Sequence, residues 1–123
     1  MSDDLKKLAY RNLLDVFNER NSEDRSRAIR EIYDESVVFY DPEEAVVGWD
    51  SLNDKAQAIL NDAPGFLFRP EGEVRISHNL AYLAWSFGPR DGDPVITGID
   101  ISIVENGRIT ALYTMLNVTV ETP

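Results

Sequence analysis

The sequence predicts an α+β domain in which helices pack on one face of an antiparallel sheet. Up to Pro64, apolar residues recur at helical spacing, and from Phe66 onward the chain reads as strands separated by turns. The pair Asn106-Gly107 between two strand-like runs favours a type I′ hairpin turn. Helices followed by an antiparallel meander are typical of the α+β class. We expect one domain, residues 1–123, without an internal repeat or a linker.

Three helices are predicted from their ends and their apolar faces. The first begins at Ser2 or Asp3 and ends in the polar stretch 18–21, the second begins at Asn21 or Ser22, and the third runs from Asp50 or Ser51 to Pro64. Their apolar faces comprise, in turn, Tyr10, Leu13, Leu14 and Phe17; Ala28, Ile29, Ile32 and Tyr33; and Leu52, Ala56, Ile59 and Leu60.

The strands are predicted from short runs rich in β-branched and aromatic residues. A first strand, 37–40, stops at Asp41-Pro42, and residues 45–48 form a short edge strand. The remaining strands are expected at 66–69, 73–77, 80–87, 95–105 and 108 to about Val120.

Composition excludes several classes of function. The chain has 12 Lys and Arg against 22 Asp and Glu, a net charge of −10, one His and no Cys. This charge repels nucleic acid, and the absence of cysteine excludes disulfides, thiolate zinc sites and cysteine nucleophiles. The acidic N-terminus and the short apolar runs predict no membrane segment, so we expect a cytoplasmic protein. No metal and no cofactor are expected, which leaves carboxylates and phenols to carry any chemistry.

Asp100 interrupts a strand of isoleucines, and its pattern allows two interpretations. In one, Ile99, Ile101 and Ile103 face the core while Asp100 faces water. In the other, the sheet is covered on both sides, because Ile96 shares the face of Asp100 and the strand 80–87 is apolar on both faces.

Strand register gives Asp100 specific neighbours. A two-residue hairpin turn pairs Asp100 with Tyr113, and a symmetric closure of the loop 89–94 pairs Asp100 with Leu83 and Gly98 with Trp85. A carboxyl group among these side chains would be desolvated, which raises its pKa. Asp41, in contrast, also fits an ordinary strand end before proline.

The order of several features resembles the SnoaL-like polyketide cyclases and Δ5-3-ketosteroid isomerases of the nuclear transport factor 2-like superfamily. These features are the helix end at Phe17-Asn18, the strand end Tyr40-Asp41-Pro42, Gly48 before the third helix, and Gly98-Ile99-Asp100 in the penultimate strand. The resemblance covers nearly the whole chain. It implies a cone-shaped roll, in which the N-terminal helices and a curved antiparallel sheet enclose a pocket.

The resemblance also implies roles for two aspartates. Asp41 matches the general base of the isomerases, and Asp100 matches an acid that stays protonated and donates a hydrogen bond to the enolate oxygen. The isomerases carry a further tyrosine where this chain has Leu13; either Tyr10 or Tyr113 could supply that phenol, or nothing does.

Two hypotheses about function follow. The first is an isomerase or cyclase that abstracts a proton next to a carbonyl; the second is a non-catalytic ligand-binding or dimeric interaction module of the same fold. The expected catalytic residues are Asp41, Asp100, Tyr113 and Tyr10, and the expected residues around a small apolar or aromatic ligand are Leu13, Phe17, Leu83, Trp85, Phe87 and Gly98.

A homodimer is expected through the outer face of the sheet. If Asp100 faces a pocket under the helices, the alternate residues of its strand form an exposed apolar patch: Val95, Thr97, Ile99, Ile101 and Ile103. A patch of this kind is larger than a monomer usually exposes. A twofold axis would bury it against its own copy.

Overall fold

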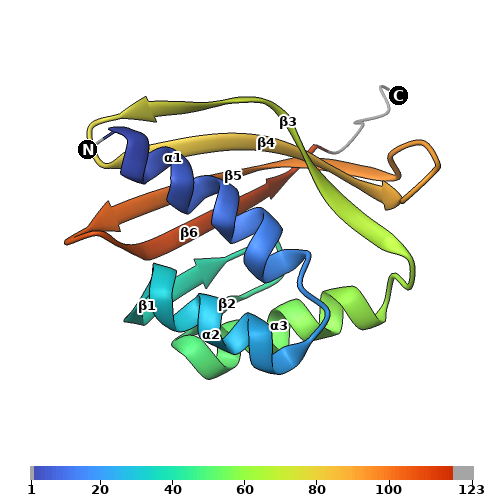
Figure 1. Cartoon of the computed structure of the whole chain (residues 1–123), viewed down its shortest axis with the longest axis horizontal. Helices are drawn as coiled ribbons and strands as arrows, with labels where there is room; N and C mark the ends of the chain where they lie inside the picture. The colour runs from blue at the N-terminus through green and yellow to red at the C-terminus, as the bar shows by residue number, and fades with distance from the viewer. Residues whose placement is uncertain (1, 118–123) are drawn as a thin grey trace.

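A computed structural model describes residues 2–117 of the chain, except for the side chain of Ser2, and shows helices on one side of a six-stranded sheet (Figure 1). The helical elements are α1 (Ser2–Arg11), the π-helix η1 (Asn12–Phe17), α2 (Ser22–Ile32) and α3 (Trp49–Asn61). The strands are β1 (Tyr33–Tyr40), β2 (Ala45–Val47), β3 (Phe66–Ser77), β4 (Leu80–Pro89), β5 (Ile96–Glu105) and β6 (Arg108–Leu116). The predicted α+β class is confirmed.

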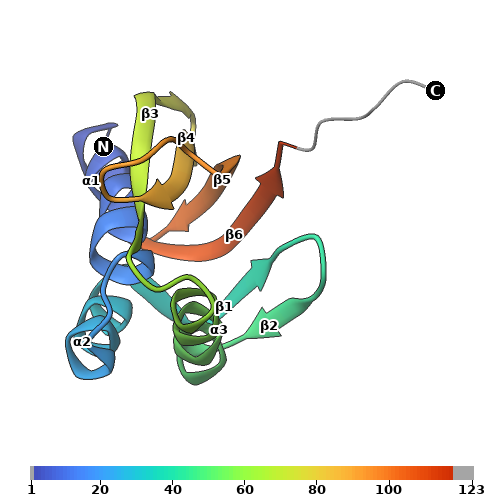
Figure 2. The same ribbon diagram turned by 90° about the vertical axis from the view of Figure 1, so that its right-hand side faces the viewer.

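The sheet is curved and open, and its strand order is β2-β1-β6-β5-β4-β3 (Figure 2). All neighbours are antiparallel except β1 and β6, which run parallel. The expectation of a wholly antiparallel sheet is therefore wrong at this one pair. A parallel pair needs a long crossover connection, and the segment from β2 to β5 supplies it. Within the described chain, no helix is long and apolar enough to cross a membrane.

β3 is one long strand where two short ones were expected. Its register against β4 shifts between Glu71 and Arg75, and Gly72 in that interval has a φ of 83°. The glycine marks an irregularity inside a continuous edge strand, and Pro70 is tolerated because β3 has a neighbour on only one side. The predicted end of the last strand at Val120 lies outside the described residues.

The first helix changes its winding at Asn12. In η1 the amide of Asn18 donates to the carbonyl of Leu13 at 3.0 Å, the i→i+5 bond of a π-helix. Asn12 lies four residues after Leu8, and Val16 four after Asn12; all three are buried, whereas Leu14 is 43% exposed. The prediction that Leu14 belongs to the buried face is wrong, because the helix buries the face of Leu8 and Asn12 and Leu14 lies on the opposite side.

The hairpin between β5 and β6 contains a bulge that the sequence pattern did not predict. Asn106 and Gly107 have positive φ angles of 51° and 78°, and Glu105 pairs with Arg108 as expected. Beyond Val104, however, the register shifts by one residue, so that Asp100 pairs with Thr114 instead of Tyr113. A one-residue slip reverses the faces of all later side chains.

Candidate functional site

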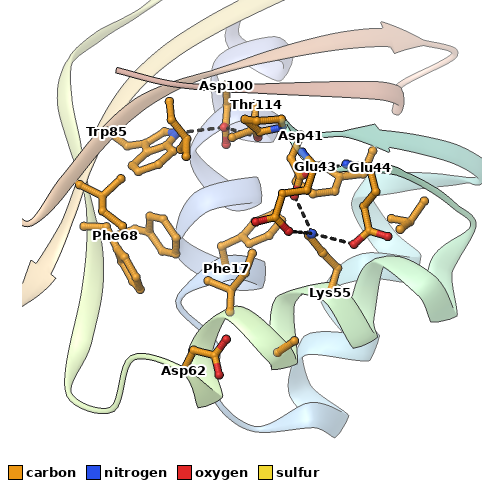
Figure 3. A pocket seen from close by; sticks show the side chains of 18 of the residues that line it. Phe17, Asp41, Glu43, Glu44, Lys55, Asp62, Phe68, Trp85, Asp100 and Thr114 are labelled. Atoms are coloured by element: carbon orange, nitrogen blue, oxygen red, sulfur yellow. Dashed lines mark hydrogen bonds and ion pairs between the residues drawn. The ribbon is translucent and has the colours of Figure 1, made fainter. Parts of the chain in front are cut away.

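A cavity of about 730 Å³ lies between the concave face of the sheet and the helices (Figure 3). Its apolar lining is rich in aromatic rings that pack on one another; Phe68 lies 4.0 Å from Phe87 and 5.1 Å from Trp85 between ring centroids. The lining side chains are Leu13, Phe17, Phe39, Pro42, Val46, Ala58, Ile59, Phe68, Trp85, Phe87, Ile96 and Leu116, with the polar residues Asp41, Glu43, Glu44, Ser51, Asp54, Lys55, Asp62, Asp100 and Thr114.

Asp100 is the buried acid of this cavity. Its exposed fraction is 6%, and both carboxylate oxygens accept hydrogen bonds. Oδ1 accepts from Trp85 Nε1 at 2.9 Å and from Thr114 Oγ1 at 2.7 Å, and Oδ2 accepts from Asn12 Nδ2 at 2.9 Å. Every one of these partners is a donor, so the arrangement suits a carboxylate. A carboxylate has about four acceptor positions, and one on Oδ2 stays available.

Alternation along β5 decides between the two interpretations of Asp100. Gly98, Asp100 and Ser102 are buried under the helices, whereas Ile99, Ile101 and Ile103 face outward and are only half-buried. The interpretation in which Asp100 faces water is wrong. The aspartate points inward because α1 and η1 cover this face of the sheet.

Gly98 provides the space that the Trp85 indole occupies. The two residues pair across β4 and β5, as predicted. A Cβ atom on Gly98 would lie 2.5 Å from Trp85 Cζ2 and 2.6 Å from the carbonyl oxygen of Met115. The glycine therefore allows the indole to lie across β5, where its N–H reaches Asp100.

Asn12 and Tyr33 complete the surroundings of Asp100, and the sequence analysis did not identify either. The Tyr33 hydroxyl donates to Asn12 Oδ1, and both side chains are buried. Asn12 lies four residues after Leu8 and three after Ala9, both buried, so helical periodicity was the available signal for it. Thr114 was missed because of the bulge; the odd spacing of the buried pair Ile109 and Leu112 was the available signal.

Burial is the main influence on the titration of Asp100. It raises the pKa of this carboxyl to about 6, and the hydrogen bonds from Thr114, Trp85 and Asn12 oppose that rise. A group with such a pKa exchanges its proton near neutral pH, as an acid–base catalyst must.

Asp41 lies at the end of β1 in an ion pair with Lys55 of α3. Its Oδ2 is 2.7 Å from Lys55 Nζ, its Oδ1 accepts from the amides of Glu43 and Glu44 at 2.9 Å, and both paired side chains are 11% exposed. Glu44 Oε2 is also 2.9 Å from Nζ. Burial would raise the pKa of Asp41, but the Lys55 and backbone hydrogen bonds outweigh it and lower that pKa. The same two carboxylates raise the pKa of Lys55 against the effect of burial.

The other predicted site residues separate into three groups: those that line the cavity, those behind its lining, and two phenols outside it. Leu13, Phe17, Trp85 and Phe87 line the cavity. Leu83 and Gly98 lie behind that lining, in the core and beneath the indole.

The two candidate phenols do not line the cavity. Tyr10 is half-buried and packs against the core. Tyr113 pairs with Ile101 and is 42% exposed on the outer face, where its ring stacks on Tyr40 at 4.4 Å. The expectation that Tyr113 shares a face with Asp100 is wrong because of the bulge in β6, and Thr114 contacts the carboxylate instead.

Comparison with known proteins agrees with this architecture. A model of the SnoaL-like domain matches residues 10–112. A structure from Agrobacterium tumefaciens, named a candidate isomerase of the SnoaL-like family, is 24% identical with a TM-score of 0.87, and the match covers 96% of this chain and all (100%) of the other. No curated protein matches the chain.

Two further structures share the fold at lower identity. A candidate ketosteroid isomerase from Kribbella flavida is 17% identical with a TM-score of 0.74, over 98% of this chain and 83% of the other. A candidate polyketide cyclase from Sinorhizobium meliloti is 19% identical with a TM-score of 0.71, over 93% of this chain and 98% of the other.

Proposed function

We propose that this chain, which belongs to the SnoaL-like domain family, is an isomerase or cyclase that moves a proton next to the carbonyl group of a small apolar or aromatic molecule. The observation that carries the proposal is the buried Asp100 in the wall of an aromatic cavity, with a pKa of about 6 and donors alone as its protein partners. The volume of about 730 Å³ falls in the range of small-molecule sites.

Asp100 is the proton acceptor in this proposal. Its ionised carboxylate takes a proton from the carbon next to the carbonyl through Oδ2, the C–H electron pair becomes the enolate, and the same carboxyl returns the proton to a different carbon or to the product. The family resemblance implied the opposite division of roles, with Asp41 as base and a neutral Asp100 as donor. Hydrogen bonds to Asp100 come from donors only, and the lowered pKa of Asp41 makes it the weaker base; both observations favour Asp100.

Lys55 and Asp41 form the second polar group of the cavity. The Lys55 ammonium stays protonated because the carboxylates of Asp41 and Glu44 pair with it and raise its pKa. Asp41 is itself held in place by hydrogen bonds from the backbone amides of Glu43 and Glu44. A positive charge in a cavity that is largely apolar stabilises an enolate oxygen more than it would in water. We propose that Lys55 supports the developing oxyanion and that Asp41 positions Lys55.

Deuterium exchange tests this proposal without knowledge of the natural substrate. A panel of apolar cyclic and aromatic ketones is incubated with the protein in D₂O, and incorporation at the α-carbon is measured by mass spectrometry. The proposal expects exchange above the buffer rate for the ketones that bind, and a loss of roughly 10²–10⁴-fold in Asp100→Asn. Lys55→Met should lower the rate with less effect on binding.

The alternative is a ligand-binding module of the same fold. The absence of a phenol from the cavity lining favours it, since Leu13 occupies the position at which the isomerases have tyrosine. This alternative expects ketones to bind, by fluorescence of Trp85 or by calorimetry, with no exchange at all and with affinities that Asp100→Asn and Asp41→Asn leave unchanged. Binding without exchange across the whole panel would refute the catalytic proposal.

A further inference from the structure

A chain of three buried polar side chains ends at Asp100. The Tyr33 hydroxyl donates to Asn12 Oδ1, and Asn12 Nδ2 donates to Asp100 Oδ2 at 2.9 Å. Tyr33 is 0% and Asn12 1% exposed, and neither lines the cavity, so neither would contact a ligand. Asn12 is 88 residues away from Asp100 in sequence, and three elements, β1, η1 and β5, meet at this chain.

We infer that Asn12 and Tyr33 are positioning residues that hold Asp100 in the ionised form that accepts a proton. A side-chain amide has a donor end and an acceptor end, and either could face a carboxyl group. Only the NH₂ end suits a carboxylate, whereas the oxygen end would accept a hydrogen bond from the neutral acid. The orientation of Asn12 therefore favours the ionised form of Asp100 against the effect of burial.

Tyr33 decides that orientation. Its hydroxyl proton is given to Asn12 Oδ1, which leaves the NH₂ group of Asn12 to face Asp100. Turning the amide would remove the acceptor of a fully buried hydroxyl, and a buried donor without an acceptor is costly. Burial, and then the charge of Asp100, raise the pKa of Tyr33 well above its ordinary value, so the phenol keeps its proton.

The other charged groups near the cavity do not replace this effect. Those that line it come from the β1–β2 connection, from α3 and from the residue that follows α3: Asp41, Glu43, Glu44, Asp54, Lys55 and Asp62. Lys55 is held by Asp41 and Glu44. The influences that oppose the burial of Asp100 are instead three hydrogen bonds, from Thr114, Trp85 and Asn12.

Helical periodicity brings Asn12 to the inner face. It lies four residues after Leu8 and three after Ala9, and both of these are buried. Asn12 is also the first residue of η1, whose wider turn keeps Leu13 and Phe17 close to the face of Asn12 and Val16. Insertions of this kind occur often at functional sites.

The titration of Asp100 in Tyr33→Phe tests the inference. The pKa is read from the ¹³C shift of the Asp100 carboxyl by NMR in the full chain. We expect it to rise by roughly 0.5–1 unit, because Asn12 is then free to turn its oxygen toward the neutral acid. Tyr82→Phe is the matched control, since Tyr82 pairs with Ile101, and not with Asp100, in the register of β4 and β5. An unchanged pKa in folded Tyr33→Phe would overturn the inference.

A double-mutant cycle shows whether Tyr33 acts through Asn12. Asn12→Leu removes the donor and should raise the pKa of Asp100 at least as much, and adding Tyr33→Phe to it should then change nothing. Independent, additive pKa shifts in the two variants would overturn the inference. If Tyr33→Phe does not fold, the pKa of Asp100 in Asn12→Leu still tests the role of Asn12. That the ionised Asp100 accepts a proton from a substrate rests on the proposed function, whereas the effect of Asn12 and Tyr33 on the pKa of Asp100 does not. The expected pKa shifts in the variants, together with no ketone exchange by the wild type, would refute the proposed function alone.

Discussion

Replacing Asp100 with asparagine should stabilise the protein at neutral pH. The folded carboxyl has a pKa of about 6 against an ordinary value of 3.8, so folding opposes its ionisation. The difference of about 2 units corresponds to roughly 3 kcal/mol at a pH well above 6. Because the folded-state pKa is raised, this cost is absent below pH 3.8 and grows as the pH rises from 3.8 through 6.

Asparagine can keep part of the hydrogen bonds. Its oxygen can accept from Trp85 and Thr114, and its NH₂ group can donate to Asn12 once that amide turns. The turn leaves the Tyr33 hydroxyl proton without its acceptor, at a cost of roughly 1 to 3 kcal/mol. We therefore expect Asp100→Asn to gain roughly 0 to 2 kcal/mol at pH 8 and to be less stable than the wild type near pH 4.

Urea unfolding of both proteins between pH 4 and pH 8 measures this difference, with tryptophan fluorescence as the signal. Asp91→Asn in the exposed loop between β4 and β5 is the control and should not change the pH dependence. A variant that is less stable than the wild type at pH 8, or a difference that is the same at pH 4 and pH 8, would refute the reasoning. The variant should at the same time lose ketone exchange, since stability and function compete at this side chain.

Three further predictions follow from the same contacts. Asp41→Asn should destabilise the fold by roughly 1 to 3 kcal/mol at a pH above the unfolded pKa of the carboxyl, because Lys55 loses its main ion-pair partner. Since the pKa of Asp41 is lowered in the folded state, this loss of stability should disappear as the pH falls. Urea unfolding at a series of pH values measures the loss and its pH dependence. Gly98→Ala should cost roughly 1–3 kcal/mol and displace the Trp85 indole, seen as a shift in its fluorescence and in the indole N–H resonance; an unmoved resonance would contradict the packing. We propose a homodimer through the outer face, so sedimentation at micromolar concentration should show a dimer that Tyr113→Glu dissociates, and a monomeric wild type would refute it.

The dimer proposal rests on the apolar outer face of the sheet. Exposed apolar side chains of β1 and β6 and half-buried isoleucines of β5 gather there, and a groove among them is lined by residues including Tyr40, Leu80, Ile103, Tyr113 and Met115. Ile99, Ile101 and Ile103 were predicted to lie on this face, because they alternate along β5 with an inward-facing Asp100. The structure adds the stacked pair of Tyr40 and Tyr113; the predicted register had assigned Tyr113 to the other side of the sheet.

Local patterns were sufficient for most of the fold. The Asn106-Gly107 turn needs two positive φ angles whatever its surroundings, and the symmetric closure of the loop after Pro89 correctly paired Trp85 with Gly98. The inward direction of Asp100 was one of two predictions, and the mixed character of its face was the correct signal. The family resemblance agreed with the domain model that matches residues 10–112.

Tertiary structure alone decided which side chains lie beside Asp100. The bulge in β6 replaced Tyr113 with Thr114, and the packing of the first helix buried the face of Asn12 and not that of Leu14. The sequence by itself determined most of the segments that form helices and strands, because these depend on local patterns, and it left a desolvated Asp100 as one of two interpretations. The partners of that aspartate depend on contacts between residues up to 88 positions apart, and only the packed fold brings those together.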